Sequence, residues 1–360
     1  MGVTVAVVGA GLAGLSAAWA LDGAGADVVV LDAGRRPGGM IVTERREGFI
    51  VEGGPDGFLA AEPDIQELAR EVGIEDRLVD QVARGSTLWT GGGGRLETLP
   101  EGRAAELLGI QGVGDSGLSR GFRSFAAGMA EVVEALVTRL AARLRTTQGV
   151  TAIARAPRGW RLSFTGASSL DAEAVILAVP AWVAARLVAG LGVSAARALD
   201  TVLYAPSITV SLAYRADQVP ETLEGAGFVA ALDSGSAVRA CTYAWRKYPN
   251  RAPDGFALLR AFVGPVDGDP APIAHAELVA IAGLRGAPLW TRAFHWPRGL
   301  PRYRPGHAER VAAVRDRLAR LAPLAIAGAG FDGAGVSACV KSGREAAKSV
   351  LERLGSPVRG

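Results

Sequence analysis

The fold of the amino-terminal part of the chain is decided by the stretch VVGAGLAGLSAAWALDGAGADVVVLDAGRRPGGM, which runs from Val7 to Met40. Its apolar beginning predicts a buried strand over residues 3–8, and the alanine- and leucine-rich part that follows predicts a helix over residues 12–22. The valine run at residues 28–31 predicts a second strand. A strand, a helix and a strand in this order form one βαβ unit of a parallel sheet.

Gly9, Gly11 and Gly14 form the pattern GxGxxG between the first strand and the helix. The first glycine allows a tight turn, the second a close approach of backbone to a pyrophosphate, and the third close packing of helix on strand. The amino end of the helix carries unsatisfied N–H groups, which favour an anion. Asp32 ends the second strand, where a carboxylate accepts hydrogen bonds from a ribose diol and disfavours a 2′-phosphate. The sequence therefore predicts a site for FAD or NAD, with a plain structural turn as the alternative.

Composition narrows the class of protein. A chain of 360 residues is expected to form two joined domains, and its net charge of +3 comes from arginines dispersed among acids, which argues against a nucleic-acid partner. Cys241 and Cys339 stand far apart and the three histidines form no ligand pattern, so we expect neither a disulfide nor a metal site. Met1 leads directly into an apolar strand, and the longest apolar stretch, residues 174–185, is short for a membrane span. We therefore expect a soluble, cytoplasmic protein without a secretory signal.

The rest of the chain predicts a second domain inserted into the first. Four consecutive strands with turn residues between them are typical of an antiparallel sheet, and they are expected over residues 207–214, 227–232, 238–245 and 256–263. Other predicted elements are a glycine turn at residues 91–94, loops or short turns over 99–122, a long helix over 125–144 and a closing helix over 335–354. We expect the nucleotide-binding domain to comprise residues 1–85, 125–200 and 301–360, the sheet domain residues 201–300, and a short connecting segment residues 86–124.

The residues that follow the second strand carry a longer pattern. DAGRRPGGMIVTERREGFIVEGGPDGFLA has an arginine, a glycine pair, two short strands and a second glycine turn. It resembles the second FAD motif, ExxxRxGG, of the flavin amine oxidase and protoporphyrinogen oxidase superfamily, a continuation that NAD dehydrogenases lack. Further stretches look like consecutive landmarks of oxygen-dependent protoporphyrinogen and coproporphyrinogen oxidases: VEGGPDGFLA, YAPSITVSLAYRADQVPETLEGAGFVA, APDGFALLRAFVG, LRGAPLWTRAFHWPRGLPRYRPGHAERV and LAIAGAGFDGAGVSACVKSGREAA.

The resemblance implies an α/β fold of the flavin amine oxidase type, a Rossmann-like FAD-binding domain with an inserted antiparallel-sheet substrate domain. It implies an enzyme of heme biosynthesis that oxidises protoporphyrinogen IX, or coproporphyrinogen III, to the porphyrin while O₂ is reduced to H₂O₂. The residues that it assigns to FAD are Gly9, Gly11, Leu12, Ala13, Gly14, Asp32, Ala33, Arg36, Gly38, Gly39, Met40, Gly53, Gly54, Pro55, Val150, Trp296, Gly328, Gly335, Val336 and Ser337. Those that it assigns to the substrate are Arg103, Ala226, Gly227 and Val229, with Arg120 and Arg123 as alternatives to Arg103.

No catalytic side chain is expected, because the flavin performs such chemistry and the protein supplies position, shape and electrostatic field. Reduced flavin carries negative charge near N1, and the amino end of the helix that opens around Val336 could stabilise it. His295 and His307 are expected to have structural roles, and Cys339 is expected to lie in the core.

The chain departs from the family in two places. Family members carry a largely helical domain where this chain has only residues 103–123, and that domain forms much of the substrate cavity and of the membrane-facing surface. Ala226 stands where the family usually has an aromatic residue. We therefore expect a wider pocket, weak or absent membrane contact, and room for a protein partner from the heme pathway. Two other functions stay open: an FAD-dependent amine oxidase or desaturase-like oxidoreductase, and a non-catalytic FAD-binding or porphyrin-carrying paralogue.

Overall fold

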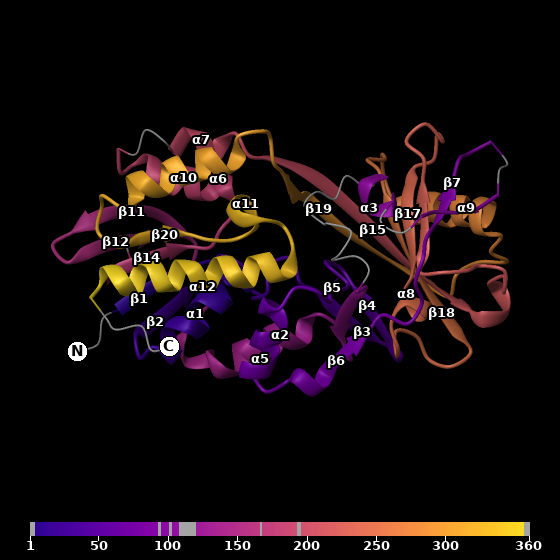
Figure 1. Cartoon of the computed structure of the whole chain (residues 1–360), viewed down its shortest axis with the longest axis horizontal. Coiled ribbons are helices and arrows are strands. Elements are labelled where there is room, and N and C mark those ends of the chain that lie inside the picture. The colour runs from indigo at the N-terminus through magenta and orange to yellow at the C-terminus, as the bar shows by residue number, and fades with distance from the viewer. Residues whose placement is uncertain are drawn as a thin grey trace.

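The computed structural model describes residues 4–92, 95–100, 103–107, 120–165, 168–192 and 196–355. Figure 1 shows two halves that follow one another along the longest axis of the molecule. One half contains a parallel sheet with helices packed on it, and the other is built on a larger, mostly antiparallel sheet.

The α/β half is built on a five-stranded parallel sheet. Its strands, in spatial order, are β10 (Leu144–Arg145), β2 (Asp27–Leu31), β1 (Thr4–Val8), β14 (Ala174–Leu177) and β20 (Leu324–Ile326). Successive side chains point to opposite faces of a sheet. In β1, Val5 and Val7 enter one apolar core, whereas Ala6 and Val8 enter another. Burial on both faces explains why these strands are continuous apolar runs in the sequence.

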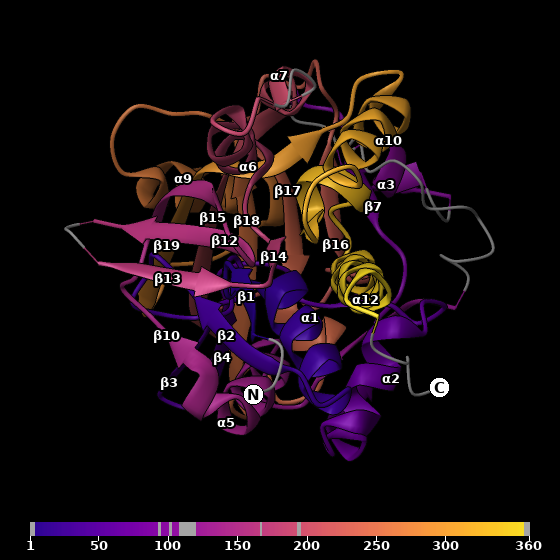
Figure 2. The ribbon, with the colours of Figure 1, turned by 90° about the vertical axis from the view of Figure 1, so that its left-hand side faces the viewer.

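Different elements cover the two faces of this sheet (Figure 2). The first core is formed with α1 (Leu12–Gly23), α2 (Asp64–Glu71), α5 (Ala130–Arg139) and α12 (Val336–Arg353). The second core is formed with the antiparallel strands β11 (Val150–Ala156), β12 (Gly159–Phe164) and β13 (Ser169–Ala172) and with α6 (Ala181–Ala189), α7 (Ala196–Asp200) and α10 (His307–Leu318). The parallel sheet therefore lies between two apolar layers.

The other half is built on a seven-stranded sheet. In spatial order its strands are β19 (Trp290–Arg302), β15 (Leu203–Arg215), β18 (Phe256–Val263), β17 (Val238–Tyr243), β16 (Gly227–Ala230), β7 (Thr87–Trp89) and β8 (Glu97–Thr98). Only β16 and β7 pair in parallel. The helix α9 (Pro270–Ala282) packs on one face and forms an apolar core with it. The opposite face of the sheet is left to meet the α/β half.

Small elements and two long strands connect the halves. The hairpin β3 (Thr43–Arg46) and β4 (Phe49–Glu52) and the sheet of β5 (Phe58–Leu59), β9 (Phe122–Phe125) and β6 (Leu78–Asp80) lie between them (Figure 1). β15 and β19, 13 residues each, pair with one another and extend from the larger sheet toward the α/β half. The described residues also form the short helices α3 (Arg103–Leu107), α8 (Ala244–Lys247) and α11 (Ala329–Asp332) and the 3₁₀ turns Glu75–Arg77, Ala141–Arg143 and Ala216–Gln218.

The predicted fold class is confirmed, but the single helix expected over residues 125–144 is wrong. The chain forms the strand β9 up to Phe125, turns, and continues as α5, a 3₁₀ turn and β10. Gly128 makes the break: its φ is +101°, and a Cβ there would lie 2.3 Å from Cγ2 of Thr43. Within residues 99–122, expected to lack regular structure, the described part includes α3, while residues 101–102 and 108–119 lie outside the described residues. No helix of the described chain is long and apolar enough to cross a bilayer.

Candidate functional site

Two of the three glycines at the junction of β1 and α1 cannot be replaced by a residue with a side chain. Gly9 has a φ of +105°, and a Cβ there would lie 2.2 Å from the carbonyl oxygen of Ala178. A Cβ at Gly14 would lie 1.9 Å from the carbonyl oxygen of Gly9, so glycine is what allows α1 to approach β1. At Gly11 the nearest atom to such a Cβ is 4.0 Å away. The space beside Gly11 is open, as a phosphate site requires.

Two helix amino ends near this turn carry no side-chain cap. The N-cap positions of α1 and α12 are Gly11 and Gly335, and neither helix has an acidic residue in its first turn. The first N–H groups of each helix therefore have no intrahelical partner and carry partial positive charge. Such ends favour the anionic groups of a ligand.

The two helices come from opposite ends of the chain and lie side by side, as the neighbouring α1 and α12 ribbons show in both views (Figures 1 and 2). Gly343 on α12 packs so closely on α1 that a Cβ there would lie 2.1 Å from the carbonyl oxygen of Ala13. Gly328, in the loop after β20, has a φ of +112°, and a Cβ there would lie 3.5 Å from that of Ala13. The loop is held by Ser342, whose Oγ accepts a hydrogen bond from the Gly328 N–H at 2.8 Å. The two glycine-rich turns thus form one cradle.

Ser337, in the first turn of α12, uses its side chain elsewhere. Its Oγ accepts a hydrogen bond from the Ile65 N–H at 3.3 Å and donates to Oδ2 of Asp64 at 3.4 Å, so it ties α12 to α2. Val336 is buried in the first core. The side chains of Val336 and Ser337 are therefore engaged within the protein. The groups that they can offer to a cofactor are their backbone N–H groups.

Asp32, at the carboxyl end of β2, is already bonded to the backbone. Its Oδ2 accepts from the Ala10 N–H at 2.6 Å and its Oδ1 from the Gly34 N–H at 2.7 Å, contacts that the sequence did not reveal. A carboxylate oxygen has a further lone pair, so Asp32 can hold the turn and still accept from a ribose diol. Val150 lies near Ala33, the residue after Asp32. The preceding residue, Gly149, packs on Ala33 so closely that a Cβ added at Gly149 would lie 3.3 Å from the Cβ of Ala33.

Arg36 shapes the loop that follows. Its guanidinium donates to three backbone carbonyls, those of Pro37, Gly39 and Ile41, at 2.9, 2.5 and 2.7 Å. Burial lowers the pKa of Arg36, and the charge of Asp32 opposes this effect. The Gly38 N–H donates to the Ala10 carbonyl at 2.7 Å, which joins this loop to the first glycine turn. The predicted contact of Arg36 with FAD stays a prediction, because the structure shows its guanidinium engaged within the loop.

A third glycine turn, residues 53–55, lies where the two halves meet. A Cβ at Gly54 would lie 1.8 Å from the carbonyl oxygen of Met40, and one at Gly53 would lie 2.5 Å from the ring of Phe294 on β19. The turn is therefore wedged between the loop around Met40 and the open face of the seven-stranded sheet. Pro55 completes it.

Two side chains of the larger sheet bind the carbonyls of this turn. Trp296 Nε1 on β19 donates to the Gly53 carbonyl at 2.7 Å, and Arg260 Nη2 on β18 donates to the Gly54 carbonyl at 2.5 Å. Trp296 was predicted to lie near the flavin, whereas Arg260 was missed. The sequence does hint at Arg260, because an arginine in the middle of the apolar strand FALLRAFV is unusual. In the structure its side chain lies on the face of the sheet opposite to the α9 core.

The turn is surrounded by five charged side chains, here named the interface charge cluster: Glu52, Asp56, Lys247, Arg251 and Arg260. Burial raises the pKa of Glu52 to about 7, against the hydrogen bonds that its carboxylate accepts. Burial also raises the pKa of Asp56, but Lys247, whose Nζ lies 2.9 Å from its Oδ2, and Arg260 outweigh it and hold that pKa below the ordinary value. Burial lowers the pKa of Arg251 and of Arg260.

Two buried polar atoms on the face of the sheet beside the turn have no hydrogen-bond partner within the described chain. They are Arg260 Nε and Thr209 Oγ1. Thr209 on β15 lies opposite Phe262, two residues along β18 from Arg260. Because buried donors and hydroxyls are nearly always satisfied, this face fits a bound polar group or ordered water. Together with the open space at Gly11 and the uncapped helices, the residues present fit a flavin dinucleotide.

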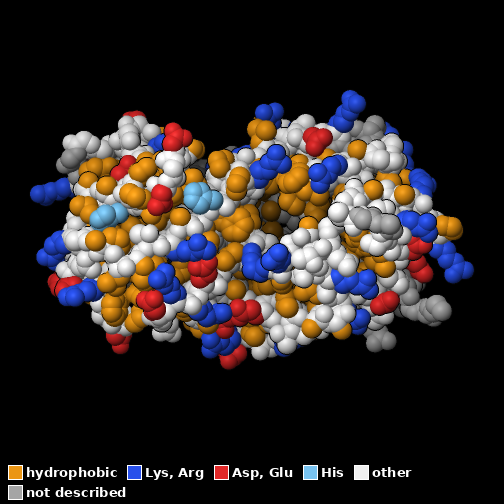
Figure 3. Space-filling view, turned by 180° about the vertical axis from the view of Figure 1, so that it is seen from behind, with side chains coloured by type: hydrophobic (Ala, Val, Ile, Leu, Met, Phe, Trp, Pro, Cys, Tyr) orange, Lys and Arg blue, Asp and Glu red, His pale blue; other side chains and the backbone are white. Residues whose placement is uncertain are grey.

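The residues predicted to bind substrate gather around β16. Phe228 points into the α9 core, so its neighbours Gly227 and Val229 face the other side of the sheet. Ala226 precedes the strand, and α3, which begins at the exposed Arg103, packs against β16. Seen from behind, the surface is hollowed where the two halves meet, with hydrophobic side chains inside and Lys and Arg side chains around the rim (Figure 3). Contact of these four residues with a substrate stays a prediction.

The histidines and Cys339 make contacts of a structural kind. His307 Nε2, at the start of α10, lies 3.1 Å from the Phe331 carbonyl, and His295 lies within the ladder of β19 with β15. Cys339 Sγ donates to the Gly333 carbonyl at 3.8 Å. Within the described ranges no group of three or more His, Cys, Asp or Glu side chains could hold a metal ion.

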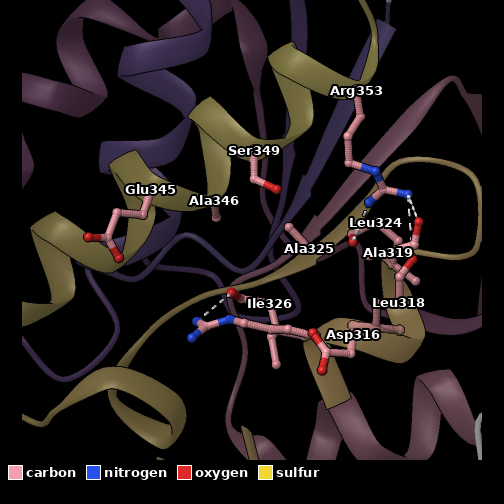
Figure 4. A pocket seen from close by; sticks show the side chains of 11 residues that line it. Asp316, Leu318, Ala319, Leu324, Ala325, Ile326, Glu345, Ala346, Ser349 and Arg353 are labelled. Atoms are coloured by element: carbon pink, nitrogen blue, oxygen red, sulfur yellow. Dashed lines mark hydrogen bonds between the residues drawn. The ribbon is translucent and has the colours of Figure 1, made fainter. Parts of the chain in front are cut away.

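A cavity of about 350 Å³ lies elsewhere in the α/β half (Figure 4). Its lining comes from α10, α12 and β20, the edge strand of the parallel sheet, and includes none of the glycine turns. Arg315 Nη2 donates to the Ile326 carbonyl at 3.5 Å and Arg353 Nη1 to the Leu324 carbonyl at 3.2 Å. Both carbonyls belong to β20, so the two arginines protect a sheet edge, and we do not assign a ligand to this cavity.

Comparison with known proteins identifies a family of flavoproteins that this chain matches. The model of the family "flavin containing amine oxidoreductase" matches residues 12–110 and 104–351. The coproporphyrinogen III oxidase of Bacillus subtilis (strain 168) is 24% identical, with 97% of this chain and 98% of the relative covered. That alignment extends over 465 positions, more than the 360 residues of this chain, so the relative contains segments that are missing here.

Solved structures show the same fold. A candidate protoporphyrinogen oxidase from Exiguobacterium sp. 255-15 superimposes with a TM-score of 0.82 at 22% identity, covering 97% of this chain and 99% of the other. The cyclohexylamine oxidase of Brevibacterium oxydans IH-35A gives a TM-score of 0.77 at 17% identity, covering 99% and 100%. Since the family model matches most of the chain, the protein belongs to the flavin-containing amine oxidoreductases and is a flavin-dependent oxidoreductase.

Proposed function

We propose that the chain is an FAD-dependent oxidase that oxidises protoporphyrinogen IX, or coproporphyrinogen III, to the porphyrin, with O₂ reduced to H₂O₂. The observation that carries the proposal is one open cradle beside Gly11, formed where the uncapped amino end of α1 meets the Gly328 loop that precedes the equally uncapped α12, with a third glycine turn held against the larger sheet. The name of the Bacillus subtilis relative supports a porphyrinogen as the substrate class.

In this proposal each glycine turn contacts a different part of FAD. The N–H groups of residues 11–14 and the loop of Gly38 and Gly39 hold the pyrophosphate. Asp32, Ala33 and Val150 hold the adenosine. Gly53, Gly54, Pro55 and Trp296 border the isoalloxazine, while Gly328 and the N–H groups of residues 335–337 lie along the ribityl chain and the pyrimidine ring.

A bound flavin supplies the redox chemistry, the uptake of hydride from the substrate and its passage to O₂. The amino end of α12 favours negative charge on the ligand by about 0.3–1 kcal/mol when exposed and up to about 2 kcal/mol when partly buried. The ring of Phe294 packs against Gly53 and the Met40 carbonyl packs against Gly54, so the turn is closely surrounded on both sides. In this proposal Gly227 and Val229, on the face of β16 opposite to the α9 core, contact the substrate, and Arg103 supplies a cation for a substrate carboxylate.

The test uses purified protein loaded with FAD and each porphyrinogen in turn. Porphyrin fluorescence should rise only after O₂ is admitted, with H₂O₂ formed alongside. Gly11→Asp is the matched control: the space around Gly11 tolerates a side chain, but a carboxylate there repels a pyrophosphate, so the variant should fold and stay colourless. Yellow protein that oxidises neither porphyrinogen would refute the proposal.

Amine oxidation is the second candidate function. It is favoured by the missing segments relative to the Bacillus subtilis relative, since these leave the hollow between the halves open (Figure 3). An oxygen electrode with a panel of primary and cyclic amines beside the two porphyrinogens separates the candidates by which substrates cause oxygen uptake. Tight porphyrin binding without turnover of any substrate would instead indicate a porphyrin-carrying paralogue.

A further inference from the structure

The turn that would border the isoalloxazine is fixed from the opposite half of the molecule. Both of its successive carbonyls, those of Gly53 and Gly54, accept hydrogen bonds from the seven-stranded sheet, from Trp296 and Arg260 respectively. The Gly53 N–H donates to the Val42 carbonyl at 2.8 Å. Fixing two consecutive planar peptides leaves the dihedral angles between them little freedom.

This arrangement leaves one backbone donor free. The Gly54 N–H makes no hydrogen bond within the described chain, and in a trans peptide it points away from the Gly53 carbonyl that Trp296 holds. Steric contact prevents the turn from relaxing, because a Cβ at either glycine would overlap Phe294 or Met40. The free N–H is therefore presented in one orientation.

Arg260 adds charge as well as a hydrogen bond. The residue is 5% exposed, and its guanidinium acts on Glu52 and Asp56, the two carboxylates that flank the turn in sequence. Its Nε has no partner in the described chain, and a cavity of about 10 Å³ beside it, lined also by Glu52, Asp56 and Arg251, has room for about one water. A buried cation here favours negative charge on any group bound against the turn.

We propose that Arg260 is a positioning residue that, together with Trp296, orients the Gly53–Gly54 peptide toward the isoalloxazine and favours the reduced, anionic form of the flavin. This inference rests on the proposed flavin site. It makes the redox behaviour of the cofactor depend on a side chain of the substrate-binding half.

The test compares two arginines of the interface charge cluster that are similarly buried. Arg260→Lys and Arg251→Lys both keep a positive charge, but only the first loses the planar donor that reaches Gly54, since Arg251 instead bonds Ser124 and the Phe125 carbonyl. Arg260→Met also removes the charge, and Trp296→Phe removes the indole N–H while keeping a smaller aromatic ring.

Two readouts are measured. In protein without flavin, hydrogen–deuterium exchange of the peptide covering residues 50–57 should be faster in the Arg260 and Trp296 variants than in Arg251→Lys. In protein with flavin, the ratio of reduced to oxidised flavin at equilibrium with a reference dye should fall by about tenfold or more in Arg260→Met and less in Arg260→Lys. Arg251→Lys should leave the ratio near that of the unaltered protein.

The proposal is overturned if the Arg260 variants match Arg251→Lys in both exchange and redox ratio. Failure of every variant and of the unaltered protein to bind flavin would refute the proposed function instead, while the exchange measurement would still decide whether Arg260 and Trp296 hold the turn. If Arg260→Met does not fold, the Arg260→Lys comparison carries the test.

Discussion

Gly14 and Gly23 stand at opposite ends of α1 and differ in what surrounds them. A Cβ at Gly14 would lie 1.9 Å from the Gly9 carbonyl oxygen, whereas one at Gly23 would meet nothing within 4 Å. We predict that Gly14→Ala costs about 1–3 kcal/mol of unfolding free energy through overpacking and sharply weakens flavin binding. Gly23→Ala should be neutral or stabilising by up to about 1 kcal/mol. Urea denaturation and flavin content measure both effects, and equal behaviour of the two variants would contradict the packing argument.

Glu52 gives the protein a specific pH dependence. Its side chain is 4% exposed, and burial raises its pKa from 4.5 to about 7. Between pH 4.5 and about pH 7, Glu52 is therefore mostly protonated in the folded state and mostly ionised in the unfolded chain. Stability should therefore fall as pH rises across this window, by about 3 kcal/mol in total, and level off above it.

Glu52→Gln should remove this loss, because the amide cannot ionise. We expect the variant without flavin to be no less stable than the unaltered protein near pH 5 and clearly more stable near pH 8, by about 2–3 kcal/mol. Glu47→Gln, at a site where the side chain is 65% exposed, is the control and should follow the unaltered protein. Parallel pH profiles for Glu52→Gln and the unaltered protein would show that folding does not raise the pKa of Glu52.

Residues whose role is local could be predicted from the sequence, and residues whose role depends on distant partners could not. Gly9 and Gly14 were identified because a strand, a turn and a helix in sequence already require them. The bond of Asp32 to the Ala10 N–H and the contact of Arg260 with Gly54 join segments 22 and 206 residues apart. No spacing in the sequence encodes such contacts; the only signal for Arg260 was a charged residue in the middle of an otherwise apolar strand.

The contact between α1 and α12 brings the two ends of the chain together. We predict that Gly343→Ala separates these helices, because its Cβ would lie 2.1 Å from the Ala13 carbonyl oxygen, with a cost of about 1–3 kcal/mol. Flavin binding should weaken with it, since the amino end of α12 moves. Lys348→Ala, on the exposed side of the same helix, should change stability by less than about 0.5 kcal/mol. Denaturation midpoints and flavin dissociation constants for the two variants provide the measurement, and unaltered flavin affinity in Gly343→Ala would argue against convergence.

Element prediction failed where tertiary contact overrode a local pattern. The apolar spacing from residue 125 onward favours a helix, but Phe125 is taken up by β9, and Gly128 packs against Thr43 in a conformation closed to other residues. By contrast, the closing helix predicted over residues 335–354 forms as Val336–Arg353. That helix begins directly after a glycine and packs along its whole length, so local and distant preferences coincide.

The two halves are joined by an ion pair between Asp56 and Lys247, with side chains 24% and 12% exposed. Lys247→Met should cost about 1–3 kcal/mol, because it leaves a largely buried carboxylate without its partner. The pair holds the pKa of Asp56 below its ordinary value, so its contribution is present above about pH 4 and is lost as the pH falls further.

A second substitution checks this reasoning for the whole molecule. The double variant Asp56→Asn with Lys247→Met should recover part of the lost stability, since the amide needs no counter-charge. Thermal unfolding at about pH 7 and about pH 3 distinguishes the outcomes. A single-variant loss that is the same at both values would mean that packing, not charge, accounts for it.

β15 and β19 pair along both halves, from Leu203 with Arg302 to Ala213 with Trp290. The two strands run side by side from the seven-stranded sheet to the α/β half, so a hinge between the halves would have to bend a hydrogen-bonded two-stranded ribbon. Because a paired ribbon resists bending, we expect the hollow seen in Figure 3 to keep nearly the same width at all times. A bulky ligand should then enter and leave at rates set by its diffusion and its fit to the hollow, rather than by opening and closing of the two halves.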